Sequence, residues 1–135
     1  MALQFSSTVR NNMLDAIETT VGLTPILRVY DGALPVDAAA AAAGTVLAEI
    51  TMPSDWLAAA TGGTKTKSGT WQDLSANADG TAAYFRIYDS TATTCHLQGV
   101  VTPTGGGGDL TVNSTNFRIT QQFTISSFIL VAGNA

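Results

Sequence analysis

From residue 25 onward, the chain is a series of short segments rich in Thr, Val, Ile and aromatic residues, bounded by Gly, Asn, Asp or Pro. β-Branched and aromatic residues favour extended strands, whereas the bounding residues favour turns. Many short strands joined by close turns are typical of an all-β sandwich or barrel. Residues 53–63, "PSDWLAAATGG", are an exception, because Ser54 or Asp55 could cap a short helix that ends at Gly62 and Gly63.

Residues 6–22, "SSTVRNNMLDAIETTVG", form the best candidate for a helix. Ser6 or Ser7 can cap its start, and Gly22 is a natural end. Its apolar residues recur at helical spacing and would form one buried stripe: Val9, Met13, Leu14, Ile17 and Val21. We therefore predict a single domain over residues 1–135, mainly β, with an N-terminal helix at about 6–21 and β structure at about 25–133.

One six-residue pattern occurs twice, as "LRVYDG" at 27–32 and "FRIYDS" at 85–90. Alternate side chains of a strand face opposite ways, so the aliphatic and Phe positions would share one face, and Arg and Tyr the other. We predict strands at 26–30 and 83–88, each turning at an Asp and returning in another strand; chance similarity between strands is the alternative. The side chains predicted to be buried are Leu27, Val29, Phe85 and Ile87, and those predicted to point away from the core are Arg28 and Arg86.

The C-terminal segment "QQFTISSFILVAG" (121–133) contains no charged residue. Its alternation breaks at Ser126 and Ser127, where a β-bulge would redirect the second half. Either of two sets could then face the core: Phe128 and Leu130, or Ile129 and Val131. A strand edge with no charges invites pairing with another chain. We expect intermolecular contact from some combination of this segment, the N-terminal helix and the Gly/Thr region 61–70, which we interpret as a flexible loop.

The sequence contains no recognisable catalytic constellation. Cys95 and His96 are the single cysteine and the single histidine. Neighbours on a strand point to opposite faces, so we expect a buried thiol beside an exposed imidazole rather than a nucleophilic pair. One His and one Cys also fall short of the usual ligand set of zinc. We therefore predict no catalytic, cofactor-binding or metal-binding residues, and a protein that is not an enzyme.

The charge pattern argues against two classes of partner. The net charge is −4, and among the six basic residues only Lys65 and Lys67 lie close together, so we expect no nucleic-acid binding. The N-terminal sequence has no basic region followed by a long apolar run, and we expect neither a signal peptide nor a membrane partner. Charged residues make up 12% of the chain, about half the usual share. Such a surface is suited to extensive contact with neighbouring proteins.

Seven segments carry a family resemblance: "ALQFSSTVRNNMLDAIETT", "LRVYDGALP", "LAEITMPSDW", "KSGTWQD", "GTAAYFRIYDS", "TCHLQGVV" and "GGGGDLTVNS". Together they resemble virion structural proteins of tailed bacteriophages and prophages, of the head decoration (cement) type. The resemblance spans nearly the whole chain. It implies a β-sandwich, with the jelly roll as one form, that is made in the bacterial host cytoplasm and binds the outer capsid surface in many copies. Its implied partners are the major capsid protein and other copies of itself.

An alternative is a tail-associated or carbohydrate- or receptor-binding β-sandwich module. That function would use Trp56, Trp71, Tyr84 and Tyr88 as stacking platforms, and these aromatic side chains would have to be exposed on one face. We instead expect both tryptophans to lie largely in the core. A small hydrolase is a weaker alternative, because the sequence lacks a nucleophile–base pair.

Overall fold

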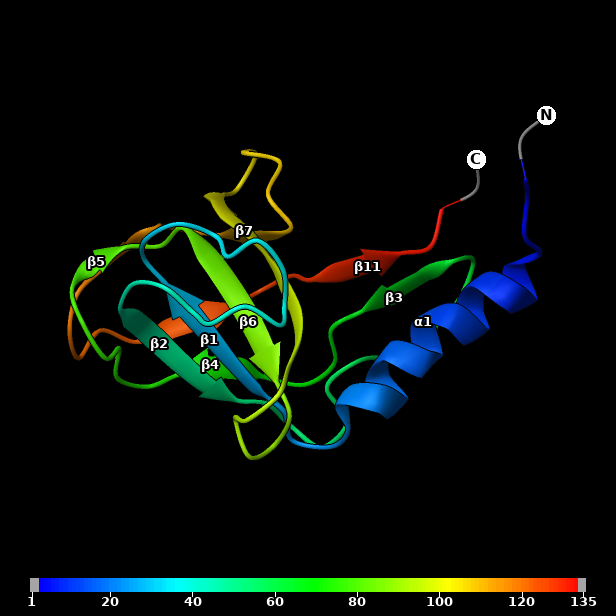
Figure 1. Ribbon diagram of the computed structural model, residues 1–135, viewed down its shortest axis with the longest axis horizontal. Helices are drawn as coiled ribbons and strands as arrows, with labels where there is room; N and C mark the ends of the chain where they lie inside the picture. Colours follow the sequence, from blue (N-terminus) through cyan, green and yellow to red (C-terminus); the bar gives the residue numbers. More distant parts are fainter. Residues whose placement is uncertain (1–2, 134–135) are drawn as a thin grey trace.

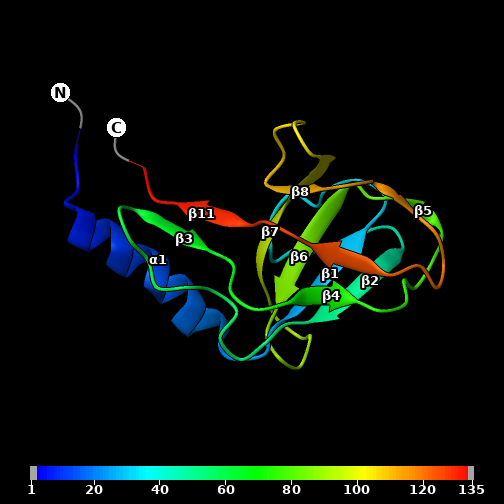
Figure 2. The ribbon, with the colours of Figure 1, turned by 180° about the vertical axis from the view of Figure 1, so that it is seen from behind.

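The computed structural model describes residues 3–133 and shows a mainly β protein with one helix, α1 (Ser7–Val21), in that range. The strands are β1 (Ile26–Tyr30), β2 (Val46–Thr51), β3 (Thr64–Thr66), β4 (Trp71–Asp73), β5 (Gly80–Thr81), β6 (Tyr84–Tyr88), β7 (Cys95–Pro103), β8 (Leu110–Val112), β9 (Asn116–Phe117), β10 (Phe123–Ile125) and β11 (Ile129–Val131). Figures 1 and 2 show two parts. We call α1, β3 and β11 the arm, and the remaining strands the body.

The predicted N-terminal helix is confirmed, together with its caps. The Oγ of Ser6 accepts a hydrogen bond from the Val9 N–H at 3.2 Å, which satisfies one of the free donors of the first turn. At the other end Gly22 has φ +91°, and its N–H donates to the Glu18 carbonyl. Glycine adopts this left-handed backbone at little cost, so the helix ends where the sequence predicted.

The two copies of the repeated pattern are neighbouring strands of one sheet. Its strand order is β2-β1-β6-β7-β8, and β1 pairs with β6 in antiparallel register with Arg28 opposite Arg86. Both predicted strands are confirmed, and each returns in an antiparallel partner, β2 or β7. The order β2-β1-β6-β7 is therefore symmetric about the β1–β6 pair. The four side chains predicted to be buried, Leu27, Val29, Phe85 and Ile87, are at most 2% exposed.

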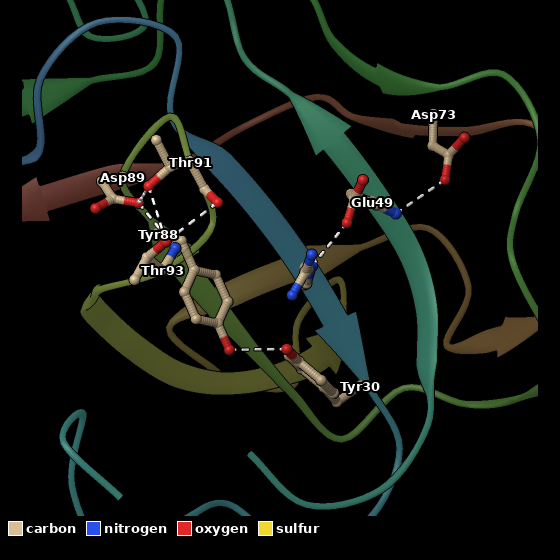
Figure 3. Close-up of polar contacts among 8 residues, drawn as sticks. Tyr30, Glu49, Asp73, Tyr88, Asp89, Thr91 and Thr93 are labelled. Carbon is tan, nitrogen blue, oxygen red and sulfur yellow. Dashed lines mark hydrogen bonds and ion pairs between the residues drawn. The ribbon is translucent and has the colours of Figure 1, made fainter. Parts of the chain in front are cut away.

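The opposite face of β1 and β6 carries the Arg and Tyr side chains, as predicted, but the loop 31–45 covers it. The Ala43 N–H donates to the Tyr84 hydroxyl at 2.9 Å, and Arg86 is only 2% exposed. Figure 3 shows the hydroxyls of Tyr30 and Tyr88, 2.8 Å apart, meeting over this face. Burial, followed by this hydrogen bond, raises the pKa of Tyr30. The face points away from the main core, and the loop covers most of it, although Arg28 stays partly exposed at 28%.

The main core contains an aromatic cluster between the five-stranded sheet and the short β4–β10 pair. The ring centroids of Trp71 and Phe128 are 5.4 Å apart, and those of Phe85 and Phe128 are 5.8 Å apart in an edge-to-face arrangement. Trp56 lies beside Trp71, with centroids 6.1 Å apart. Both tryptophans are fully buried, which confirms the expectation that they belong to the core.

The short helix predicted within residues 53–63 is wrong. The side chains of the adjacent residues Trp56 and Leu57 are both buried. In extended backbone, consecutive side chains point to opposite faces, whereas in a helix they point to neighbouring positions around it. The Ala58 N–H donates to the Thr66 carbonyl at 2.8 Å, so this segment pairs with β3 instead of with itself. Region 61–70 likewise contains β3 and is not simply a flexible loop.

The C-terminal segment changes direction at Ser126 and Ser127, as predicted. The break is an interruption between two strands rather than a bulge: β10 pairs with β4 in the body, whereas β11 pairs with β3 in the arm. After the break, Phe128 is buried and Leu130 is partly buried, which selects one of the two alternating sets. The second set, Ile129 and Val131, is exposed.

Candidate interaction surface

A buried lysine joins the helix of the arm to its strands. The Lys65 side chain is 1% exposed, and its Nζ lies 2.7 Å from both Asp15 Oδ1 and Glu18 Oε2. Burial opposes the charge of Lys65, but the hydrogen bonds that Lys65 donates to the two carboxylates outweigh this effect and raise the pKa of Lys65. The hydrogen bond from Lys65, and then that from the Ala60 N–H, lowers the pKa of Asp15. The charged groups therefore favour the closed contact between α1 and β3.

The first turns of α1 also bind the far end of the arm through polar groups. Arg10 Nε donates to the Ala132 carbonyl at 2.6 Å, immediately after β11. Asn11 Oδ1 accepts from the Gly63 N–H at 2.9 Å, at the turn before β3. One face of α1 is thus occupied by hydrogen bonds and ion pairs with β3 and β11.

Because these polar contacts occupy that face, much of the apolar surface of the arm is left in water. Leu14 and Val21 are buried, but the rest of the predicted helical stripe is not. The large apolar side chains that the arm exposes are Val9 (43%), Met13 (49%), Ile129 (53%) and Val131 (65%). Single exposed apolar residues are ordinary, but a group of them on one projecting element indicates an interaction surface.

Strand β11 also has a free edge. The Phe128 carbonyl accepts from the Lys67 N–H, and the Ala132 N–H donates to the Gly63 carbonyl, so these alternate residues bond to β3. The backbone polar groups of Ile129 and Val131 therefore point to the other edge. Within residues 3–133, β11 pairs with no strand except β3. No charged side chain lies in this segment to discourage pairing with another chain.

Two hollows extend this surface into the corner between arm and body. One, of about 400 Å³, lies between α1 and β7 and includes Met13, Ile17 and Leu97. The other, of about 450 Å³, lies between β11 and β7 and includes Leu97, Ile129 and Val131. Leu97 lines both hollows, so they adjoin at this residue, and their walls also include His96 in the first and Asp109 in the second. We call Met13, Ile17, Leu97, Ile129 and Val131 the arm surface.

The structure separates the two residues that could have formed a nucleophilic pair. Cys95 lines a hollow beside the loop 31–45, whereas His96 lines the hollow next to α1. The Cys95 thiol donates to the Leu97 carbonyl at 3.2 Å, and both side chains are half-buried rather than one buried and one exposed. Burial raises the pKa of Cys95, and the positive charge of Arg86 only partly opposes this. The thiol is therefore protonated at neutral pH.

The sequence reasoning missed the role of Lys65. "TKTK" at 64–67 alternates as a strand does, and Asp15 and Glu18 are three residues apart, so they share a helix face. These two patterns are the signal that could have predicted the contact. Neither pattern alone predicts that Lys65 pairs with Asp15 and Glu18, because at least 46 residues separate the two segments along the chain.

The aromatic residues proposed as stacking platforms are not available for that role. Trp56, Trp71 and Tyr84 are fully buried, and Tyr88 is 7% exposed. Ligand stacking needs an exposed ring face, so the carbohydrate-binding alternative loses the residues on which it depended.

Residues 3–133 contain no cluster of three or more His, Cys, Asp or Glu side chains placed to hold a metal ion. Among the described residues, no helix has the length and hydropathy needed to span a bilayer. Comparison with protein-family models, with curated proteins and with solved structures finds no match for this chain.

Proposed function

We propose that this chain is a structural virion protein of a tailed bacteriophage, which binds the outer capsid surface in many copies and stabilises the shell. It would be a single-domain decoration, or cement, protein made in the bacterial host cytoplasm. Its partners would be the major capsid protein and other copies of itself. The observation that supports this proposal is the arm surface.

The physical basis is the free energy of covering that surface. Apolar area removed from water contributes roughly 25 cal/mol per Å², and the free edge of β11 adds backbone hydrogen bonds. Neither gain is available to the isolated chain, because Ile129 and Val131 are 53% and 65% exposed. A specific interface centred on the arm surface should bury more than about 1,000 Å².

The proposal includes a β-sandwich of jelly-roll type for the body. Supporting this, the five-stranded sheet faces the β4–β10 pair, with β2 in contact with β4. The main buried cluster contains side chains from both layers, including Phe85 and Ile125. Two layers over one apolar core are the defining arrangement of a sandwich.

The decisive experiment uses particles of the parent phage stripped of this protein. Wild-type chain added back should bind in many copies on the head, and the refilled particles should withstand heating better than stripped ones. Val131→Asp places a charge on the arm surface and should prevent rebinding. Val36→Asp is the matched control, because Val36 is 91% exposed on the loop 31–45 of the body, and this variant should rebind normally.

Two results would overturn the proposal. The first is location at the tail alone, in a few copies, which would favour the tail-associated alternative. The second is equal heat resistance of stripped and refilled particles, which would remove the stabilising role. Circular dichroism of both variants should match that of the wild type, because each substitution replaces an exposed side chain.

A further inference from the structure

Arg86 is a buried charge without a counter-charge. Its side chain is 2% exposed, and its hydrogen bonds go to neutral acceptors: Nε and Nη2 both donate to Gln98 Oε1, at 3.1 and 2.9 Å, and Nη2 donates to the Asp37 carbonyl at 3.1 Å. Within residues 3–133, no carboxylate lies within the 4.0 Å of an ion pair with Arg86. Burying an unpaired charge is costly, so this position favours an anion.

The other half of the symmetric sheet shows what is missing. Arg28 lies opposite Glu49 on β2, and Arg86 lies opposite Gln98 on β7, at corresponding positions. The Arg28 Nε–Glu49 Oε2 distance is 2.7 Å, and Figure 3 shows Glu49 at its place on β2. Gln98 thus occupies the place of a carboxylate but carries no charge. The more deeply buried arginine is the one that lacks an internal partner.

One nitrogen of Arg86 remains available. Nη1 of Arg86 forms no hydrogen bond with any described residue. Every fully buried side-chain nitrogen or oxygen among the described residues has a hydrogen-bond partner, so Nη1 is not fully buried and retains some access to solvent. Arg86 lines a hollow of about 560 Å³ between the loop 31–45 and the start of β7. The walls of this hollow include alanines 38–42, Thr94 and Cys95. Arg86, with a free donor, therefore lines a space whose wall combines five alanine methyl groups with the polar side chains of Tyr88, Thr93 and Thr94.

We propose that this hollow binds a small aliphatic monocarboxylate, whose carboxylate pairs with Arg86 Nη1 while its hydrocarbon part contacts the alanines 38–42. The bound carboxylate takes the role that Glu49 plays for Arg28. A monoanion matches the site because Arg86 is the single cationic residue among those lining the hollow. A phosphate dianion would leave excess negative charge there. This site is separate from the arm surface and does not depend on the proposed function.

The test is a titration of the wild-type protein with butyrate at constant ionic strength, with butyramide as the uncharged control. Saturable shifts are expected in the amide NMR signals of residues 38–42 and 93–95 with butyrate only. Butyrate should also protect Cys95, the single cysteine, from alkylation by iodoacetamide. At about ten times the dissociation constant, alkylation should slow about tenfold, because about one site in ten is then empty.

Two variants identify the group responsible. Gln98→Glu supplies Arg86 with an internal carboxylate and should abolish butyrate binding. Glu49→Gln removes the carboxylate from Arg28, outside the hollow, and should leave butyrate binding unchanged.

The site is overturned if the wild type shows no saturable shifts and no protection of Cys95, or if butyramide acts as butyrate does. Equal competition by chloride would refute the preference for carboxylate, and butyrate binding by a folded Gln98→Glu variant would refute the role of Arg86. The alkylation assay on the wild type decides the question even if Gln98→Glu does not fold.

Discussion

Replacing Phe85 by Ala tests the packing of the repeated pattern most directly. The ring is 2% exposed and meets Phe128 edge-on, with centroids 5.8 Å apart. It also lies over the backbone of β7, since a Cβ added to Gly99 would come within 2.8 Å of Phe85 Cε1. Neither Phe128 nor the β7 backbone can move fully into the vacated space. We therefore expect a loss in the free energy of unfolding of about 3–5 kcal/mol, as for Phe-to-Ala changes that leave a cavity.

Urea unfolding followed by tryptophan fluorescence measures this loss. With a denaturant dependence of about 2 kcal/mol per molar urea, the midpoint should fall by roughly 1.5–2.5 M. Val100→Ala on β7 is the matched control, because Val100 is 40% exposed and lies opposite Tyr84 in register. Its loss should stay below about 1 kcal/mol. A Phe85→Ala loss no larger than that of the control would show that the core is not organised around this ring.

Three further predictions concern the arm and one loop. Ser6→Ala removes the helix N-cap and should lower the free energy of unfolding by about 1 kcal/mol, measured by urea unfolding. The pKa of Asp15 is lowered in the folded protein. The ionised carboxylate therefore stabilises the fold fully at pH values above its ordinary pKa of 3.8, and this stabilisation is lost as the pH falls below that value. Urea midpoints at decreasing pH should therefore fall more steeply for the wild type than for Asp15→Asn, and parallel curves would contradict the Lys65 contact. Gly44→Ala should destabilise the loop 31–45, because Gly44 has φ +83° and an added Cβ would collide with the Asp31 carbonyl; a thermal midpoint equal to that of the wild type would refute this.

Local patterns were enough to predict several elements. The cap at Ser6 and the glycine at 22 bound α1 because capping depends on residues close together in sequence. The alternation in both copies of the repeated pattern predicted the strands and the buried set that includes Phe85 and Ile87, because a strand exposes its side chains with a period of two. The change of direction at Ser126 and Ser127 was also visible, since the apolar alternation fails there.

Long-range pairing decided what these local patterns left open. The helix expected within residues 53–63 is absent because Ala58 pairs with β3, and the burial of Trp56 and Leu57 outweighs local helix propensity. Within the arm, Lys65 pairs with Asp15 and Glu18 across the fold, and Ile129 and Val131 are left exposed. Arg86 was expected to point away from the core, and it does, but the loop 31–45 closes over it. The sequence determined by itself which side chains share a face of a strand or helix, because that depends on backbone periodicity. Only the tertiary structure decided which faces are covered, because the covering groups come from distant parts of the chain.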